Sequence, residues 1–557
     1  MSLDLLDPPA TAATIPVLEV DGLTVSYHDG ADWHKVVHGV SFAVAPGEVV
    51  ALVGESGSGK TSTAQAIIGL LPDNGRADRG TIRLNGTDIA GWPDKRLDAI
   101  RGKTISLVPQ DPGSSLNPVK TIGDQLGEIL RIHGWRDRNA IAARSIELLA
   151  KVGLSDPELR MRQYPHELSG GMKQRVLIAI AIALEPSLII ADEPTSALDV
   201  TVQRRILDLI DDLRREIGTA VLLVTHDLGV AADRADRLIV LQDGRIKEAG
   251  PTAGILTAPQ DAYTRRLLAD APSLSAPAVQ RRAPDAAADI AVTVENLVQD
   301  FDLPGTRKSF RAVDGVSFSV PRGTTHALVG ESGSGKTTTV RTVVGFQRPT
   351  SGRITIAGTE LGGLRGEALR QLRRKIQLVY QNPFGSLDPR QSVLGIVEEP
   401  LRNYQPVAAD VRTKKASGLL ERVGLGPELW KRRPRALSGG QRQRVAIARA
   451  LVLDPEILVL DEAVSALDVT VQAQILALLA ELQRELGLTY LFVSHDLAVV
   501  RQISDTVSVL KAGRQVEAGT VETVFHHPFD AYTRELIDAI PGRRLSGRAP
   551  VQKEPSA

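Results

Sequence analysis

Short apolar runs alternate with helical stretches along the whole chain. Runs rich in β-branched residues include EVVALVG from Glu48, TISLVPQ from Thr104, SLIIADE from Ser187 and AVLLVTHD from Ala220. Because such short, nearly continuous runs are typical of strands buried on both faces, they predict a mostly parallel sheet covered by helices, an α/β fold. The longest apolar run, VLIAIAIAL from Val176, is too short to span a bilayer.

The second half of the chain repeats the first. The ten residues LVGESGSGKT begin at Leu52 and again at Leu328, and DAYTR begins at Asp261 and at Asp530. Between these points the order of the other shared segments is kept, so the chain is a tandem of two homologous domains rather than an array of short repeats.

Ala and Pro dominate the segment 271–289, which lacks apolar periodicity and is typical of a semi-extended linker. The predicted organisation is a flexible tail at 1–15, a first domain with a C-terminal extension at 16–270, a linker at 271–289, a second domain with a C-terminal extension at 290–542, and a flexible tail at 543–557.

The composition excludes several functional classes. Lys and Arg number 66, equal to Asp and Glu at 66, so the chain has no basic character that would favour binding to nucleic acid. With Cys 0, disulfides, thiolate metal sites and cysteine-bound iron–sulfur clusters are excluded. The start MSLDLLDPPATAA lacks the positive region of a secretory signal, and we expect a soluble chain.

Both copies of LVGESGSGKT fit the pattern G-x-x-x-x-G-K-[ST] between an apolar strand and a helix. Backbone N–H groups of such a loop face phosphate oxygens, the lysine adds positive charge and the threonine hydroxyl ligates Mg²⁺. The predicted nucleotide-binding residues are Gly54, Ser56, Gly57, Ser58, Gly59, Lys60, Thr61 and Ser62 in the first half, and Gly330, Ser332, Gly333, Ser334, Gly335, Lys336, Thr337 and Thr338 in the second.

Two adjacent acids end a later apolar strand in each half, in LIIADE and ILVLDE. Acids in such places are often solvated, but these recur at matching distances after a phosphate loop. The first of each pair, Asp192 or Asp461, suits the magnesium shell together with Thr61 or Thr337. The second, Glu193 or Glu462, is positioned by the pattern to polarise the attacking water.

A glutamine and a histidine also follow apolar strands in each half. Either residue alone would be interpreted as a structural hydrogen-bonding group. Because they repeat in register with the phosphate loop, we assign Gln110 and Gln381 to the metal site and His226 and His495 to the catalytic group, as candidates for sensing the γ-phosphate.

Two weaker signals complete the candidate nucleotide sites. Tyr27 and Phe301 end the first strand of each half and fit either stacking on an adenine ring or a place in the core. An LSGG segment precedes a long helix in each half, which offers a second helix N-terminus to an anion. Its predicted residues are Ser169, Gly170, Gly171, Ser438, Gly439 and Gly440.

Taken together, these motifs resemble the ATP-binding-cassette (ABC) ATPases over nearly the whole of both halves. The resemblance implies two tandem P-loop NTPase (ABC) nucleotide-binding domains, each with a mostly parallel sheet core, an antiparallel β subdomain and a helical subdomain. In that family two cassettes pack head to tail, and each ATP lies between the phosphate loop of one and the LSGG of the other. One chain would then supply two composite sites, both of which we expect to hydrolyse ATP.

More closely, YPHELSGGMKQR in the first half and HHPFDAYTRELI in the second resemble the two ATPase subunits of peptide/nickel importers, fused. The resemblance implies ATP and Mg²⁺ as cofactors, and two integral-membrane permease subunits and an extracytoplasmic solute-binding protein as partners. It places the chain at the cytoplasmic face of the cell membrane. Di- or oligopeptides are the first expectation for the solute, and nickel and glutathione-like solutes stay open.

The chain departs from these relatives in a few places. Many of them bind an iron–sulfur cluster through cysteines after the YT segment, and no such cluster is expected here because the chain has Cys 0. Ala463-Val464 replaces the Pro194-Thr195 of the first half, and Met172 stands where the second half has Gln441. The alternative of a tandem-cassette translation factor acting on the ribosome would call for a long charged helical connector, whereas this linker is short and carries few charges.

Overall fold

The computed structural model describes residues 15–274, except 31 and 197, and residues 289–542, except 303–308, 405–406 and 466. The predicted tail 543–557 lies outside the described residues, as do linker residues 275–288 and all of the tail 1–15 but its last residue. Two compact units share the chain: Met1–Ser196 with Arg205–Arg266, and Ala197–Arg204 with Leu267–Ala557.

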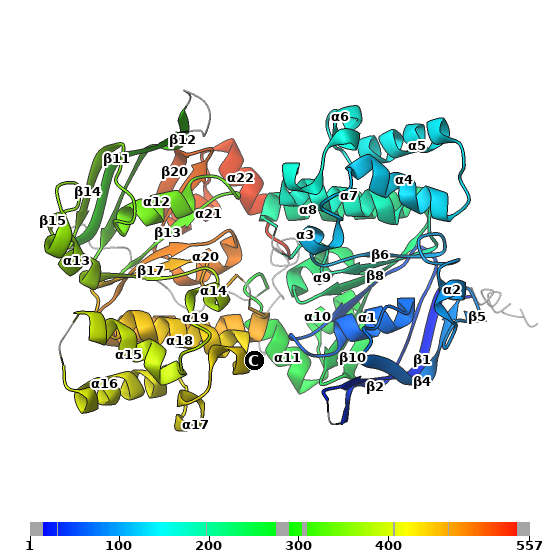
Figure 1. Cartoon of the computed structure of the whole chain (residues 1–557), viewed down its shortest axis with the longest axis horizontal. Coiled ribbons are helices and arrows are strands. Elements are labelled where there is room, and N and C mark those ends of the chain that lie inside the picture. The colour runs from blue at the N-terminus through cyan, green and yellow to red at the C-terminus, as the bar shows by residue number, and fades with distance from the viewer. Residues whose placement is uncertain are drawn as a thin grey trace, which may run out of the picture. The chain divides into compact units, whose positions relative to one another are not determined.

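The first unit contains a mixed six-stranded sheet in the order β10-β9-β3-β8-β7-β6 (Figure 1). All of its pairings are parallel except that of β9 with β10. The strands are β3 (Val49–Val53), β6 (Ile105–Val108), β7 (Leu188–Asp192), β8 (Ala220–Thr225), β9 (Arg237–Gln242) and β10 (Arg245–Pro251). Every residue of β3, β7 and β8 is buried, which explains their continuous apolar runs.

An antiparallel sheet in the order β2-β1-β4-β5 packs beside this sheet. Its strands are β1 (Leu18–His28), β2 (Trp33–Val44), β4 (Gly75–Leu84) and β5 (Thr87–Asp88). Leu18 and Val25 of β1, Ile67 of the first helix, and Leu52 and Ile190 of the parallel strands share one buried core. The antiparallel sheet therefore supports the helix that follows the phosphate loop.

The helices of the first half lie around these sheets. They are α1 (Lys60–Ile68), α2 (Asp94–Leu97), α3 (Pro112–Ser115), α4 (Ile122–Ile132), α5 (Arg138–Lys151), α6 (Pro157–Arg162), the short η1 (Pro165–Glu167), α7 (Gly170–Ala181), α8 (Val200–Ile217), α9 (Leu228–Arg234), α10 (Thr252–Thr257) and α11 (Ala262–Asp270). Helices α3 to α7 contact one another and form a helical subdomain.

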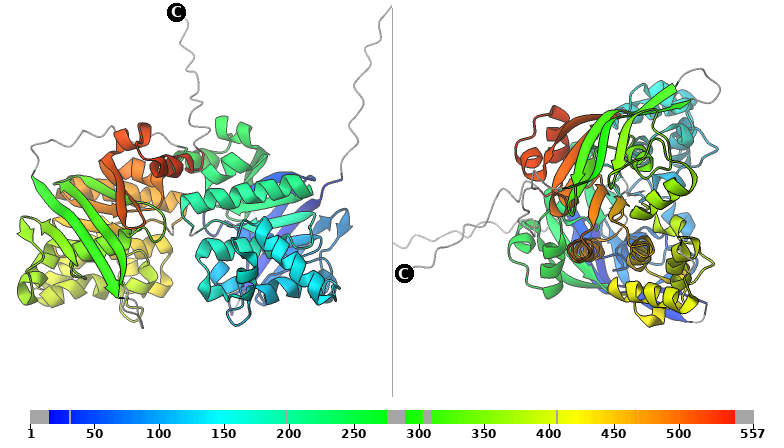
Figure 2. Two further views of the ribbon diagram at one scale, coloured as in Figure 1. Left: turned by 90° about the horizontal axis from the view of Figure 1, so that it is seen from above. Right: turned by 90° about the vertical axis from the view of Figure 1, so that its left-hand side faces the viewer.

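The second unit repeats this plan. Its six-stranded sheet has the order β16-β17-β18-β13-β19-β20, again with one antiparallel pair, β19 with β20. These strands are β13 (Thr325–Val329), β16 (Ile376–Val379), β17 (Ile457–Asp461), β18 (Thr489–Val493), β19 (Thr506–Lys511) and β20 (Arg514–Thr520). Its antiparallel sheet, β12-β11-β14-β15, contains β11 (Ile290–Asp302), β12 (Ser309–Pro321), β14 (Ser351–Ile356) and β15 (Thr359–Glu360). The long strands β11 and β12 lie side by side in every view (Figures 1 and 2).

The helices of the second half follow the same order. They are α12 (Lys336–Val343), α13 (Gly366–Lys375), α14 (Pro383–Ser386), α15 (Val393–Tyr404), α16 (Ala409–Arg422), α17 (Pro427–Trp430), the short η2 (Pro434–Ala436), α18 (Gly439–Leu451), α19 (Val469–Leu486), α20 (Leu497–Ile503), α21 (Val521–His526) and α22 (Ala531–Asp538). Helices α14 to α18 form the second helical subdomain.

The predicted fold class is confirmed: each unit has a mostly parallel core sheet, an antiparallel sheet and a helical subdomain. Parallel strands direct their C-terminal ends to one edge of a sheet, where ligands of α/β folds bind. The phosphate loops, the acid pairs and the histidines all follow such strand ends. Within the part of the chain that the structure describes, none of the helices combines the length and the apolar character that crossing a bilayer requires.

Candidate active sites

The phosphate loops are built around glycines that no other residue could replace without a shift. The first loop connects β3 to α1, and a Cβ added to Gly54 would lie 2.2 Å from the carbonyl oxygen of Leu241. In the second loop, a Cβ on Gly330 would lie 2.1 Å from the carbonyl oxygen of Leu510. Gly59 and Gly335, at φ 97° and 99°, precede the first helical residue in the left-handed conformation. This leaves the N-terminal N–H groups of α1 and α12 directed at the loop, as an anion site requires.

A buried lysine lies inside each loop. The Lys60 Nζ donates hydrogen bonds to the carbonyl oxygens of Gly54 and Glu55, each at 2.8 Å. Lys336 donates in the same way to Gly330 and Glu331, each at 2.8 Å. Burial lowers the pKa of Lys336 against the opposing effect of nearby carboxylates. The loop carbonyls therefore hold each ammonium group where phosphate oxygens would bind.

A threonine hydroxyl and a strand-end aspartate meet next to each lysine. The Thr61 Oγ1 donates to Asp192 Oδ1 at 3.3 Å, and Thr337 Oγ1 donates to Asp461 Oδ1 at 3.5 Å. Burial, reinforced by the neighbouring glutamate, raises the pKa of Asp192 to about 6, and burial with Glu462 does the same for Asp461. A cation at this point would favour the ionised carboxylates.

These two oxygens fit Mg²⁺, which uses one or two protein oxygens and completes its octahedral shell with water and nucleotide phosphates. Among the described residues no group of three or more His, Cys, Asp or Glu side chains is arranged to hold a metal ion. The pairs Thr61–Asp192 and Thr337–Asp461 would supply two protein oxygens each and leave the other positions of the shell to water and phosphate.

The structure brings the predicted glutamine, glutamate and histidine together in both units. The Gln110 Nε2 donates to Glu193 Oε2 at 2.8 Å, and His226 Nδ1 lies 3.0 Å from Glu193 Oε1. In the second unit, Gln381 Nε2 donates to Glu462 Oε2 at 2.7 Å, and His495 Nδ1 lies 3.3 Å from the same oxygen. The three residues therefore lie together in both units, and the assignment of Gln110 and Gln381 to the metal site stays a prediction.

Charge pairing sets the protonation of these groups. Burial opposes ionisation of Glu193, but the hydrogen bond and positive charge of His226 outweigh it and lower the pKa of the carboxyl. Burial likewise disfavours the charged imidazole, yet Glu193 raises the pKa of His226. Glu462 and His495 shift in the same directions. Each glutamate is thus held ionised, the state in which it can accept a proton from water.

The backbone of these glutamates is unusual. Glu193 has φ 45° and Glu462 has φ 48°, in the left-handed region that residues with a Cβ avoid. The conformation is held by hydrogen bonds from their N–H groups to the carbonyls of Val224 at 2.8 Å and Val493 at 3.0 Å. Such conformations cluster at functional sites, where they aim a side chain.

The LSGG segments begin helices, as predicted, but with unequal caps. The Ser169 Oγ accepts a hydrogen bond from the Met172 N–H at 3.4 Å at the start of α7. The Ser438 Oγ accepts from the Gln441 N–H at 3.3 Å, and the Gln441 Oε1 accepts in return from the Ser438 N–H at 3.0 Å. Only α18 of these two helices therefore has the reciprocal capping box.

The two aromatic candidates differ in their surroundings. Tyr27, at the end of β1, packs against the core, and its hydroxyl donates to Ser62 Oγ of α1 at 3.0 Å. Phe301, at the end of β11, is 37% exposed. Tyr27 thus contacts the helix that bears the phosphate loop, and a role in adenine stacking stays a prediction for both.

Comparisons with known proteins agree with this geometry. The sequence pattern of "ABC transporter" matches residues 37–196 and 313–465, more than half of the chain. The chain belongs to the ABC transporter family.

Curated relatives match over nearly the full chain. The "Peptidoglycan transport ATP-binding protein YejF" of Agrobacterium fabrum is 43% identical over 94% of this chain and 96% of its own. The "Oligopeptide transport ATP-binding protein OppD" of Mycobacterium tuberculosis is 41% identical over 94% and 98%, and the "Glutathione import ATP-binding protein GsiA" of Salmonella typhimurium is 42% identical over 94% and 89%. The chain is an ATP-hydrolysing subunit of an ABC importer.

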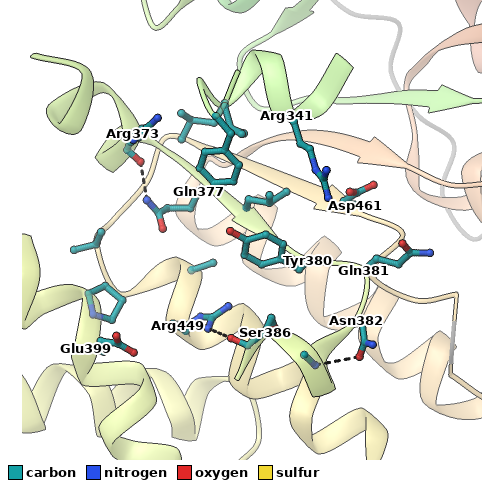
Figure 3. Close-up of a pocket in the computed structure, with 18 of the residues that line it drawn as sticks. Arg341, Arg373, Gln377, Tyr380, Gln381, Asn382, Ser386, Glu399, Arg449 and Asp461 are labelled. Atoms are coloured by element: carbon teal, nitrogen blue, oxygen red, sulfur yellow. Dashed lines mark hydrogen bonds between the residues drawn. The ribbon is translucent and has the colours of Figure 1, made fainter. Parts of the chain in front are cut away.

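A mixed cavity of about 720 Å³ in the second cassette lies beside its ATP-site candidates Gln381 and Asp461. Figure 3 shows Arg341 beside Asp461, Tyr380 in the middle of the view and Arg449 next to Ser386. The Arg449 Nη1 donates to the Ser386 carbonyl oxygen at 2.5 Å.

Sequence reasoning did not assign these three lining residues to the site, although Tyr380 directly precedes Gln381. Aligning the two halves on Lys60 and Lys336, Gln110 and Gln381, and Ser169 and Ser438 supplies the signal. By that alignment Arg341, Tyr380 and Arg449 stand where the first cassette has Gln65, Pro109 and Ile180.

Sequence reasoning also missed a tyrosine that reaches each phosphate loop from the C-terminal extension. The Tyr263 hydroxyl accepts a hydrogen bond from the Glu55 N–H at 3.1 Å, and the Tyr532 hydroxyl accepts one from the Glu331 N–H at 3.0 Å. Both tyrosines belong to the DAYTR segment, which marks the repeat and the resemblance to importers but gives no signal of a contact with the phosphate loop.

Proposed function

We propose that this chain powers the uptake of di- or oligopeptides by hydrolysing ATP at two sites and driving separate permease subunits. The observation that carries the proposal is the match of residues 516–555 to "Oligopeptide/dipeptide transporter, C-terminal region". The relatives named for oligopeptide, glutathione and peptidoglycan transport support a solute containing peptide bonds. Nothing in these comparisons favours action on the ribosome.

The geometry suggests how each cassette acts on ATP. Loop N–H groups and Lys60 bind the outer phosphates, and Thr61 and Asp192 would hold Mg²⁺, which neutralises phosphate charge. Glu193 polarises the attacking water, while Gln110 and His226 each hold one of its carboxylate oxygens. The second cassette has the same groups in Lys336, Thr337, Asp461, Glu462, Gln381 and His495.

The proposed role of the LSGG segments rests on the resemblance to ABC ATPases. Each ATP site would be completed by the LSGG of the opposite cassette: Ser438, Gly439 and Gly440 for the first site and Ser169, Gly170 and Gly171 for the second. Since each cassette has its lysine, metal-ligating pair, glutamate and histidine, both sites are proposed to turn over.

The proposed partners are two integral-membrane permease subunits and an extracytoplasmic solute-binding protein, with this chain bound at the cytoplasmic face. Coupling would run through the segments after the glutamines, 114–117 and 385–388. The cavity of the second cassette supports this assignment because Gly385 and Ser386 line it together with Gln381.

Uptake by reconstituted vesicles tests the solute. The chain and its co-purifying permease subunits are reconstituted with the ATPase and ATP inside the vesicle and the solute-binding protein outside. Such vesicles should accumulate labelled di- or oligopeptide. Accumulation of nickel or glutathione in place of longer peptides would contradict the peptide assignment while leaving the ATPase intact.

Alanine substitutions test the coupling segments. Replacing Ser114 and Ser115, or Ser386 and Leu387, should reduce uptake about tenfold or more while ATP still binds, because the changed residues lie outside the phosphate loops. Loss of ATP binding with uptake in proportion to the remaining hydrolysis would contradict the coupling role. Ala substitution at exposed Glu522 of α21 provides a control distant from these segments.

A further inference from the structure

The C-terminal extension of each cassette is fixed to the core sheet by a repeated set of hydrogen bonds. In the first cassette, Glu248 of β10 accepts hydrogen bonds from the N–H groups of Gln260 and Asp261 at 2.9 and 3.2 Å. The Asp261 carboxylate in turn accepts from the Tyr263 N–H at 2.8 Å. This arrangement fixes the first turn of α11 and therefore the position of Tyr263.

The second cassette has the same arrangement, with Phe529 in the place of Gln260. Glu517 of β20 accepts from the N–H groups of Phe529 and Asp530 at 2.8 and 3.1 Å. The Asp530 carboxylate accepts from the Tyr532 N–H at 2.8 Å. The same three hydrogen bonds occur in both cassettes. They therefore place Tyr263 and Tyr532 at equivalent positions.

Each tyrosine ends at the residue that follows the first glycine of the phosphate loop. The Tyr263 side chain is 8% exposed and the Tyr532 side chain 4%, and their hydroxyls accept from Glu55 and Glu331 as described above. The carbonyl oxygens of those same two residues accept from Lys60 and Lys336. The N–H of this loop residue is therefore bound to a tyrosine, and its C=O is bound to the phosphate-binding lysine.

We propose that Tyr263 and Tyr532 are positioning residues, which orient the phosphate loop and its lysine from the C-terminal extension. The inference rests on the proposed ATP sites. Removing the hydroxyl frees the loop residue to rotate, so the carbonyl that holds the lysine is no longer fixed. The nucleotide-free loop then has to be ordered when ATP binds, which weakens affinity.

Each loop residue also has a side-chain contact. In the first cassette, Arg266 holds the Glu55 side chain, with Nη2 3.1 Å from Oε1. In the second, the equivalent residue is Glu535, and the Thr201 hydroxyl donates to the Glu331 carboxylate instead. Each loop therefore keeps one side-chain contact when its tyrosine loses the hydroxyl, and we expect effects of similar size at Tyr263 and Tyr532.

The test uses Tyr263→Phe, Tyr532→Phe and the double variant in the full chain. Equilibrium binding of a fluorescent ATP analogue and steady-state hydrolysis are measured for each. A lost hydrogen bond of ordinary strength predicts about fivefold weaker binding for each single variant. The KM for ATP should rise while kcat at saturating ATP is kept, because no reacting group is removed.

Tyr490→Phe is the matched control. Its buried hydroxyl donates to the Leu479 carbonyl oxygen at 2.8 Å and contacts no phosphate loop. The change should lower the thermal unfolding temperature without changing KM. If Tyr532→Phe lowers unfolding temperature but leaves ATP affinity and KM within the range of this control, the tyrosine is merely structural and the inference is overturned. If the unmodified chain binds no ATP, the proposed function itself fails.

Discussion

The two cassettes of this chain are nearly identical where ATP would react and different around that site. The glutamine–glutamate distance is 2.8 Å in one and 2.7 Å in the other. Beside this shared chemistry, however, Arg449 replaces Ile180 and Tyr380 replaces Pro109. The cassettes thus have equivalent groups at the proposed ATP sites but distinct surfaces beside them, as expected if each contacts a different permease subunit.

The interior differs as well. His326 is the second residue of β13, where the first cassette has Val50. Its ring nitrogens lie 2.8 Å from Thr506 Oγ1 and 3.0 Å from Ser508 Oγ, and the ring stacks on Phe318. Burial lowers the pKa of His326 to about 3. The strand that leads into the second phosphate loop therefore contains a neutral polar cluster that the first lacks.

The largest expected effect tests whether the two sites are equal. Glu193→Gln or Glu462→Gln should each slow hydrolysis at its own site about 100-fold or more, because the amide cannot accept a proton from water. Single-turnover hydrolysis with nucleotide bound at both sites measures this. Equal residual activity in the two single variants would support two competent sites. If one site of the unmodified protein binds ATP but never cleaves it, equivalence is wrong.

A smaller effect is expected in the pH dependence of stability, which should differ between the two cassettes because of His326. The folded pKa of His326 is about 3 and the unfolded value is 6.5, so below pH 6.5 the unfolded chain binds a proton that the folded cassette excludes. Stability should therefore fall as pH falls, by up to about 1.4 kcal/mol per pH unit, reaching about 2 kcal/mol near pH 5.

Hydrogen exchange followed on peptides from each cassette measures this loss. Each cassette contains one histidine–glutamate pair, His226–Glu193 or His495–Glu462. The contributions of these two pairs to the pH dependence of stability cancel when the cassettes are compared. His326→Val, which copies the first cassette, should remove the excess acid sensitivity of the second. An equal pH slope in both unmodified cassettes would contradict the assignment to His326.

The smallest effect concerns the helices that begin at the LSGG segments. Met172→Gln should supply the missing half of the capping box and stabilise the start of α7 by about 0.5 kcal/mol. Gln441→Met in α18 should do the opposite by a similar amount. Hydrogen exchange at the two helix starts measures both, and no change in either direction would mean that the second half of the box contributes nothing here.

Much of this architecture could be predicted from the sequence because its signals are local. Continuous apolar runs predicted the parallel strands, and glycines at fixed spacing predicted the phosphate loops. Repetition brought Gln110, Glu193 and His226 into one hypothesis, although they lie far apart in the chain. In each case a residue type and its distance from a strand end were sufficient.

The remainder depends on contacts that no local pattern records. The bond between Tyr263 and Glu55 joins segments from opposite ends of one cassette, and a tyrosine in an amphipathic helix is otherwise read as core. The cavity lined by Arg449 is formed by residues that are far apart in the sequence. The positive φ of Glu193 also went unpredicted, since a glutamate gives no signal for the left-handed region.

The positive φ of Glu193 and Glu462 implies that these positions lower the stability of the fold while serving the proposed hydrolysis of ATP. A residue with a Cβ held at positive φ destabilises the folded chain by about 1 kcal/mol or more, and glycine would avoid most of this. If thermal stability alone mattered, glycine would be the better residue at positions 193 and 462. Both positions nevertheless hold a carboxylate, so each proposed catalytic glutamate lowers the stability of its own domain.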